Sequence, residues 1–152
     1  MRRGDATAAD AALDSLRRTL ERLAYVPRRV AVIAAPKITT LLQEQFRLGR
    51  DPYGVSWAPL RASTIAKGRR NPPLTDTRKL RDGTAAKARP GGRAGIALKS
   101  GAPYGAFAQV GFRVGRTRVP PRRIFPQRGI PAAWKKVLDA ASRQAVREAR
   151  AA

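Results

Sequence analysis

The stretch from Phe46 to Pro126 carries the turn and anchor signals that decide the fold of this chain. It contains, in order, FRLGRDPYGVSWAPLRAST (46–64), LTDTRKLRDG (74–83), SGAPYGAFAQVGF (100–112) and VPPRRIFP (119–126). Glycine and proline recur along it and mark turns, so the pieces between them are short. We therefore expect short strands, short helices and loops here, between longer helices at the two ends of the chain.

Four leucines that precede this stretch have the spacing of one helix face. They lie three, four and three residues apart and predict an amphipathic helix over residues 8–24. Asp5 or Thr7 is expected to cap the start of this helix, because short polar side chains accept bonds from free backbone N–H groups. The four leucines are Leu13, Leu16, Leu20 and Leu23.

A second helix is predicted from about Arg28 to Leu48. Pro27 marks the boundary before it, and Gly49 is typical of a helix stop. Pro36 interrupts the pattern, so that either the helix kinks there or a new helix begins with this proline in its first turn.

The middle of the chain predicts short elements around buried anchors. Residues 55–60 are expected to be extended, with Trp57 buried. Asp76 is expected to cap a short helix in which Leu80 faces inward and Gly83 ends the helix.

Two strands are predicted next, at 85–89 and 94–99, joined by the turn PGG at 90–92. A short helix over 103–110 and a third strand over 112–119 follow. VPPRRIFP must be extended, because its prolines disfavour helix geometry. A C-terminal helix is then expected from Pro131 to about Ala149, with Trp134 on its inner side.

These elements predict an α+β fold, in which a small antiparallel sheet packs with long N-terminal helices and a C-terminal helix. The 152 residues match the size of one ordinary domain. We divide that single domain, 1–152, into N-terminal helices (1–49), a basic strand and loop core (50–129) and a C-terminal helix (130–152).

The chain contains no cysteine and no histidine. Disulfides, Cys/His zinc sites and nucleophilic systems of the Ser-His or Cys-His type are therefore excluded. We expect no enzyme activity, no cofactor and no bound metal. No run of 18 or more apolar residues exists, so we expect no membrane-spanning helix and no membrane partner.

Charge is the strongest compositional signal, at 32 basic against 10 acidic residues and a net charge of +22. Residues 50–129 alone carry 18 basic and 3 acidic side chains, a net of +15. Such a surface favours anionic neighbours, either nucleic acid or acidic proteins. An arginine-rich proteome explains the same composition without any binding role, and both readings stay open.

Four motifs resemble, in their order, the tailed-phage virion morphogenesis family, also called tail-completion proteins, found in Mu-like and related phages. DPYGVSW matches a Pro-x-Gly-x-x-Trp element, and VPPRRIFP resembles an Ile-Pro-x-Arg-x-Phe signature. LTDTRKLRDG and PYGAFAQVGF match less fully: Asp76 stands where glycine is more frequent, and Ala108 stands where histidine is common. The resemblance covers about residues 20–140.

The resemblance implies a structural protein that completes the tail or joins head to tail, as a ring-forming neck or tail-terminator component. It further implies a homo-oligomer, hexameric in such rings, assembled in the host bacterial cytoplasm and resident in the virion neck or tail. Its partners are then neighbouring neck, portal or adaptor, and tail proteins, with non-specific contact to packaged DNA.

We predict interface or anchor roles for six residues of the basic core and structural core roles for four others. The core residues are Trp57, Leu80, Tyr104 and Trp134. Arginine can form two parallel hydrogen bonds with a carboxylate or phosphate, and a phenylalanine can anchor the segment. The interface residues are Arg113, Arg116, Arg118, Arg122, Arg123 and Phe125.

Two alternatives remain at this stage. A basic nucleic-acid-binding protein outside any virion fits the charge, although no zinc finger, RNA-recognition signature or KH loop is present. An enzyme would need carboxylates, and in the basic core Asp76 and Asp82 are the pair that lies close in sequence.

Overall fold

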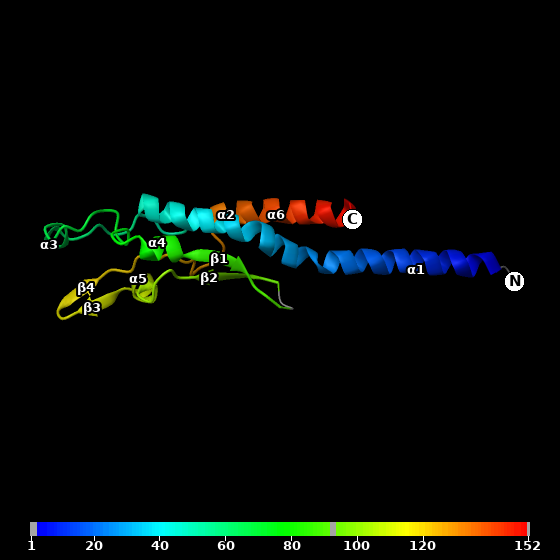
Figure 1. Cartoon of the computed structure of the whole chain (residues 1–152), viewed down its shortest axis with the longest axis horizontal. Helices are drawn as coiled ribbons and strands as arrows, with labels where there is room; N and C mark the ends of the chain where they lie inside the picture. The colour runs from blue at the N-terminus through cyan, green and yellow to red at the C-terminus, as the bar shows by residue number, and fades with distance from the viewer. Residues whose placement is uncertain (1–2, 92–93, 152) are drawn as a thin grey trace.

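The chain folds as α+β, as predicted, in a computed structural model that describes the backbone of residues 3–91 and 94–151 and the side chains of residues 11–91 and 94–151. Long helices lie at both ends of the chain, and two small antiparallel sheets lie between them (Figure 1). The elements are α1 (Arg3–Ala24), α2 (Val26–Leu48), α3 (Ala62–Ile65), α4 (Lys79–Gly83), β1 (Ala85–Ala88), β2 (Ile96–Lys99), α5 (Gly105–Val110), β3 (Phe112–Val114), β4 (Thr117–Val119) and α6 (Ala132–Ala151).

The first helix, α1, extends away from the rest of the molecule (Figure 1). It begins at Arg3, so Asp5 and Thr7 lie inside the helix and the predicted N-cap at either residue is wrong. Only Tyr25 separates α1 from α2, and the predicted boundary at Pro27 falls within the first turn of α2. Proline is tolerated there because the first N–H groups of a helix have no partner within the helix.

The second helix, α2, runs as one helix through Pro36, so a new helix does not begin at that residue. The residues around the proline, Ala34, Ala35 and Ile38, are buried, and this packing holds the helix where one backbone bond is missing. Gly49 ends α2 as predicted. Its φ of 62° is left-handed, and its N–H donates to carbonyls of the last turn.

One face of α2 forms a large part of the hydrophobic core. Ile38, Leu42 and Phe46 on this face are fully buried. The face packs against α6 on one side and against β1 on another (Figure 1). The Phe46 ring meets the edge of the Trp57 ring, with their centroids 5.5 Å apart. This geometry adds to the apolar area that both rings bury.

Three of the four predicted core residues are buried: Trp57, Leu80 and Trp134. The fourth prediction is wrong, because 43% of Tyr104 is exposed at the start of α5. An aromatic type by itself does not decide burial, and here Gly105 and Ala108 are the buried residues of α5.

The strands β1 and β2 form the predicted hairpin. They pair antiparallel from Ala85 opposite Lys99 to Ala88 opposite Ile96. β2 begins at Ile96, two residues after the predicted start, and Gly92 of the predicted PGG turn lies outside the described residues. Thr39 ties this sheet to α2, because its hydroxyl accepts the N–H of Ala86 at 2.9 Å and lies 3.2 Å from the Ala86 carbonyl.

The single strand predicted over residues 112–119 is instead a second hairpin. β3 and β4 pair antiparallel, with Phe112 opposite Val119 and Val114 opposite Thr117. The chain reverses at Gly115, whose φ of 56° is left-handed, where glycine has no side chain to clash. Alternating apolar and basic residues continue on both sides of this turn, which hid the reversal in the sequence.

The short helix α4 begins without the predicted cap. Asp76 forms an ion pair with Arg69, and no side chain caps the helix at Arg78. Leu80 faces inward as predicted, and the helix ends at Gly83.

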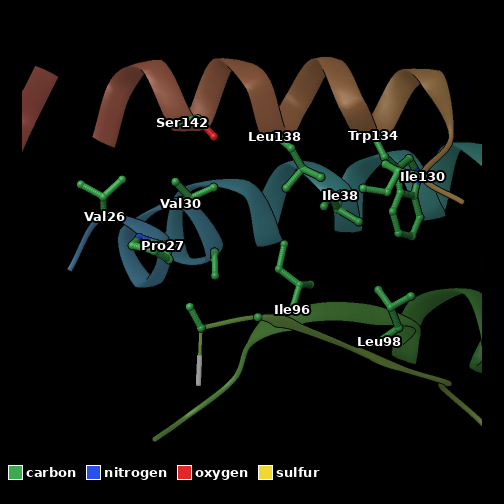
Figure 2. A pocket seen from close by; sticks show the side chains of 13 residues that line it. Val26, Pro27, Val30, Ile38, Ile96, Leu98, Ile130, Trp134, Leu138 and Ser142 are labelled. Atoms are coloured by element: carbon green, nitrogen blue, oxygen red, sulfur yellow. The ribbon is translucent and has the colours of Figure 1, made fainter. Parts of the chain in front are cut away.

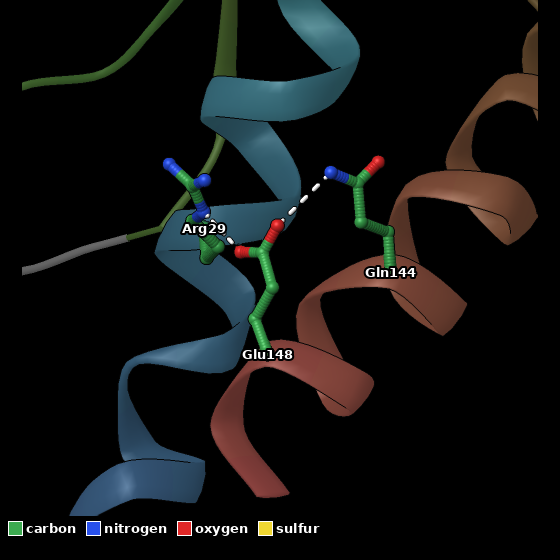
Figure 3. Close-up of polar contacts among 3 residues, drawn as sticks. All are labelled: Arg29, Gln144 and Glu148. Atoms are coloured by element: carbon green, nitrogen blue, oxygen red, sulfur yellow. Dashed lines mark hydrogen bonds and ion pairs between the residues drawn. The ribbon is translucent and has the colours of Figure 1, made fainter. Parts of the chain in front are cut away.

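Figure 3 shows a polar contact between the two long helices that frame the core. Arg29 of α2 donates to the carboxylate of Glu148 on α6 at 2.6 Å, and the Gln144 amide donates to the other carboxylate oxygen at 2.9 Å. The hydrogen bond from Arg29 lowers the pKa of Glu148 below its ordinary value of 4.5, and the bond from Gln144 lowers it further.

Replacing Gly101 by alanine is expected to destabilise the fold by about 1–3 kcal/mol, the usual cost of overpacking. The added Cβ would lie 2.6 Å from the carbonyl carbon of Gly83, and this neighbour is backbone that cannot rotate away. Urea unfolding measures the loss. The matched control is Gly95→Ala, whose Cβ meets nothing closer than the Arg89 side chain at 3.5 Å. Equal midpoints for the two variants would contradict the close approach of the two glycine segments.

Replacing Arg29 by glutamine is expected to raise the pKa of Glu148 toward 4.5, because the donor that favours the ionised carboxylate is lost. In the unchanged protein the folded-state pKa is depressed. The contact therefore stabilises the fold above the ordinary carboxyl range and loses this effect as pH falls through the folded-state pKa. NMR titration of the Glu148 side chain measures the shift. Arg143→Gln on the exposed face of α6 serves as the control, and an unchanged Glu148 pKa in Arg29→Gln would contradict the contact.

Candidate functional site

The hairpin formed by β3 and β4 brings together three of the six predicted interface residues. Arg113 on β3 lies directly opposite Arg118 on β4, and Arg116 lies in the turn between the strands. All three side chains are exposed. The hairpin lies at the end of the molecule opposite to α1 (Figure 1). We call residues 112–119 the distal hairpin.

The electrostatics of the distal hairpin are unbalanced. Like charges placed directly opposite each other across two strands destabilise the pair. In the described part of the chain, none of its three arginines forms an ion pair with a carboxylate. A fourth guanidinium approaches from the side, because Arg61 donates to the carbonyl of Arg118 at 3.3 Å. An anionic partner would remove this repulsion.

An apolar surface lies beside these charges. Side chains alternate along a strand, so Phe112 and Val114 point to the face opposite Arg113. The Phe112 ring meets Phe107 of α5 edge to face, with their centroids 6.3 Å apart. Phe107 and Val110 of α5 are 60% and 69% exposed. The distal hairpin therefore presents guanidinium groups on one face and aromatic and aliphatic groups on the other.

The other three predicted residues do not join this surface, because the segment 120–126 packs into and against the hydrophobic core. Arg122 is buried and donates through Nε to the carbonyl of Ala58 at 3.2 Å. Burial lowers the pKa of Arg122, since no carboxylate offsets the lost hydration. The prediction that Arg122 presents its guanidinium to a partner is therefore wrong, and this residue holds two parts of the same chain together.

Arg123 and Phe125 are partly buried in the same segment. The Arg123 carbonyl accepts the indole N–H of Trp57 at 3.0 Å, and Phe125 packs against the hydrophobic core. The anchor role predicted for Phe125 thus fits its place in the fold, whereas a contact with a partner at either residue stays a prediction.

The side chain of Gln109 holds this extended segment and was missed by the sequence interpretation. Its Oε1 accepts the N–H groups of Ile124 at 2.6 Å and of Phe125 at 3.0 Å, and its Nε2 donates to the Phe125 carbonyl at 2.8 Å. Buried backbone groups need such partners when no neighbouring strand supplies them. The only signal in the sequence was a proline-rich segment without a strand to pair with.

The two carboxylates weighed as a catalytic pair each have an arginine partner of their own. Asp76 pairs with Arg69, and Asp82 pairs with Arg81 at 2.7 Å. Over the described residues, no three acidic side chains gather closely enough to hold a metal ion. Within those same ranges, no helix combines the length and the apolar character needed to cross a bilayer.

No family model, no curated protein and no solved structure matches this chain.

Replacing Arg113 by threonine is expected to raise the melting temperature slightly at low salt, because the cross-strand repulsion with Arg118 disappears and threonine suits a strand. The gain should vanish at about 1 M salt, where charges are screened over about 3 Å. Differential scanning calorimetry at both salt concentrations measures it. The control Arg89→Thr removes one positive charge outside the distal hairpin, and an equal gain in this control would contradict a local effect.

Proposed function

We propose that this chain is a structural protein of a tailed-phage or phage-derived particle. In this role it forms a ring in the neck or at the tail terminus and acts in tail completion and head–tail joining. The observation that carries the proposal is the order of four motifs between Phe46 and Pro126, which resembles the virion morphogenesis family. The resemblance is supported by the α+β fold, in which Trp57 of the first motif is buried against the end of α2.

The geometry fits assembly because uncovered surfaces lie at opposite ends of one small body. The distal hairpin forms one end, and α1 forms the other (Figure 1). A component that joins two layers needs separate contacts of this kind, while the core between them keeps their spacing constant. The hydrophobic core supplies this rigid centre.

The distal hairpin would bind an acidic surface of an adjoining ring. Guanidinium groups form paired bonds with carboxylates, and Phe112 and Val114 provide apolar area beside them. Arg122 contributes indirectly, since its bond to the Ala58 carbonyl holds the segment that follows β4.

A basic nucleic-acid-binding protein outside any virion is the second candidate. The opposed pair Arg113 and Arg118, with Arg116 in the turn between them, favours it because phosphates would neutralise the same repulsion. Binding of this kind would be independent of sequence and would fall steeply with salt.

Reversing the charges of the distal hairpin tests the proposal. The variant Arg113→Glu, Arg116→Glu, Arg118→Glu is expected to reduce the yield of joined particles by about tenfold or more, since like charges across an interface cost several kcal/mol. The gene is deleted from the phage or prophage that carries it, and the variant gene is supplied on a plasmid to complement the deletion. Joined particles, free heads and free tails are counted by electron microscopy.

The matched control reverses three exposed charges on α6: Lys136→Glu, Arg143→Glu and Arg150→Glu. Circular dichroism of both variants verifies that the fold is intact. Mass spectrometry of purified particles should detect the unchanged chain. Normal particles in the deletion strain, together with salt-sensitive DNA binding by the monomer, would overturn the virion role and favour the second candidate.

A further inference from the structure

A groove with apolar walls lies open on the body of the protein. It runs between α2, α6 and β2 and encloses about 610 Å³ (Figure 2). Its main lining residues are Val30, Ile38, Ile96, Leu98, Trp134 and Leu138. We call it the apolar groove. Open apolar surfaces of this kind mark places where another molecule binds.

The leucine stripe of α1 is a second uncovered apolar surface. Leu13, Leu16, Leu20 and Leu23 are 63%, 55%, 59% and 43% exposed. They follow one face of a helix that extends beyond the rest of the molecule (Figure 1). An amphipathic helix normally owes most of its stability to packing of this face, which the chain itself leaves uncovered.

The apolar groove of the same chain is out of reach of this stripe. Only Tyr25 separates α1 from α2, and the groove begins at Val26 and Pro27. Connections that fold one helix back along the next usually take about 2–8 residues. Tyr25 is a single residue with helical backbone angles, so α1 continues away from the groove and cannot fold back onto it.

The stripe and the groove nevertheless match in length and chemistry. From Leu13 to Leu23 a helix rises about 15 Å, and along α2 from Val26 to Ile38 it rises about 18 Å. Both surfaces are apolar, and helices that bind in grooves use anchors at spacings of three and four residues.

Charge permits a second copy as the occupant, because the helical arm is nearly neutral. Residues 1–24 carry five basic and four acidic residues, a net of +1, whereas residues 25–152 carry 27 basic and six acidic residues, a net of +21. Two bodies of this charge repel each other. The helical arm is the long segment that can approach another body without adding to that repulsion.

We propose that α1 of one copy binds in the apolar groove of a neighbouring copy, with its leucine stripe facing inward. Each copy then offers an arm on one side and a groove on the other, so that the contact runs head to tail. Such contacts close into a ring when the rotation between copies allows it. This contact depends on the chain alone and stands whether or not the protein belongs to a virion.

Disulfide trapping tests which surfaces meet, because the chain has no cysteine of its own. One variant carries Leu13→Cys and Leu20→Cys on the arm, and the other carries Ser142→Cys in the groove wall. We expect the mixture, and not either variant alone, to give a covalent dimer with one chain of each under mild oxidation. A pair with Ala11→Cys and Ser15→Cys, on the opposite side of α1, serves as the control and should not cross-link.

Two results would overturn the arrangement. Cross-linking of the arm variant by itself to the same extent would show that two α1 helices pair with each other. Failure of the mixture to exceed the control would show that the arm does not enter the groove.

Sedimentation measures the contribution of the stripe in the full-length protein. The variant Leu16→Glu, Leu20→Glu is expected to weaken self-association at least tenfold, and glutamate keeps the helix propensity of α1. Ala11→Glu with Ser15→Glu adds the same charge on the opposite side and should leave self-association unchanged. A wild-type protein that stays monomeric at high concentration, or equal weakening by both variants, would overturn the proposal.

Discussion

The buried face of α2 is the constraint on which the rest of this structure depends. Ile38, Leu42 and Phe46 lie on it and are almost completely buried, and both α6 and β1 pack against this helix. Phe46, near the end of α2, packs against the Trp57 ring. This contact holds the chain that follows the turn at Gly49 against the helix. β1, α4 and α6 find their places because this apolar face must be covered.

The core is small, and this explains why so much apolar surface stays uncovered. Much of the buried face of α2 and α6 is alanine, such as Ala34, Ala35, Ala141 and Ala145, which brings helices close but buries little area per residue. The chain therefore leaves α1, the distal hairpin and the apolar groove uncovered. Both proposals follow from this small core. The distal hairpin has exposed apolar side chains beside its arginines, and α1 has an exposed leucine stripe, and each of these surfaces is suited to a partner.

Charge acts in the opposite direction, because a net of +22 drives the body away from copies of itself. Arg113 and Arg118 even face each other across one hairpin. Arg122 shows that position and not residue type decides the role of an arginine. Its guanidinium bonds to a carbonyl inside the fold, while three arginines a few residues earlier remain in solvent.

The sequence by itself determined the features that depend on near neighbours along the chain. Spacing of three and four residues predicted the long helices, and glycine and proline predicted the end of α2 at Gly49 and the hairpin of β1 and β2, because backbone geometry at these points is local. The tertiary structure alone decided that Arg122 is buried, that Tyr104 is exposed and that Gln109 holds the backbone of Ile124 and Phe125. Burial depends on what distant segments cover, and no local pattern records this.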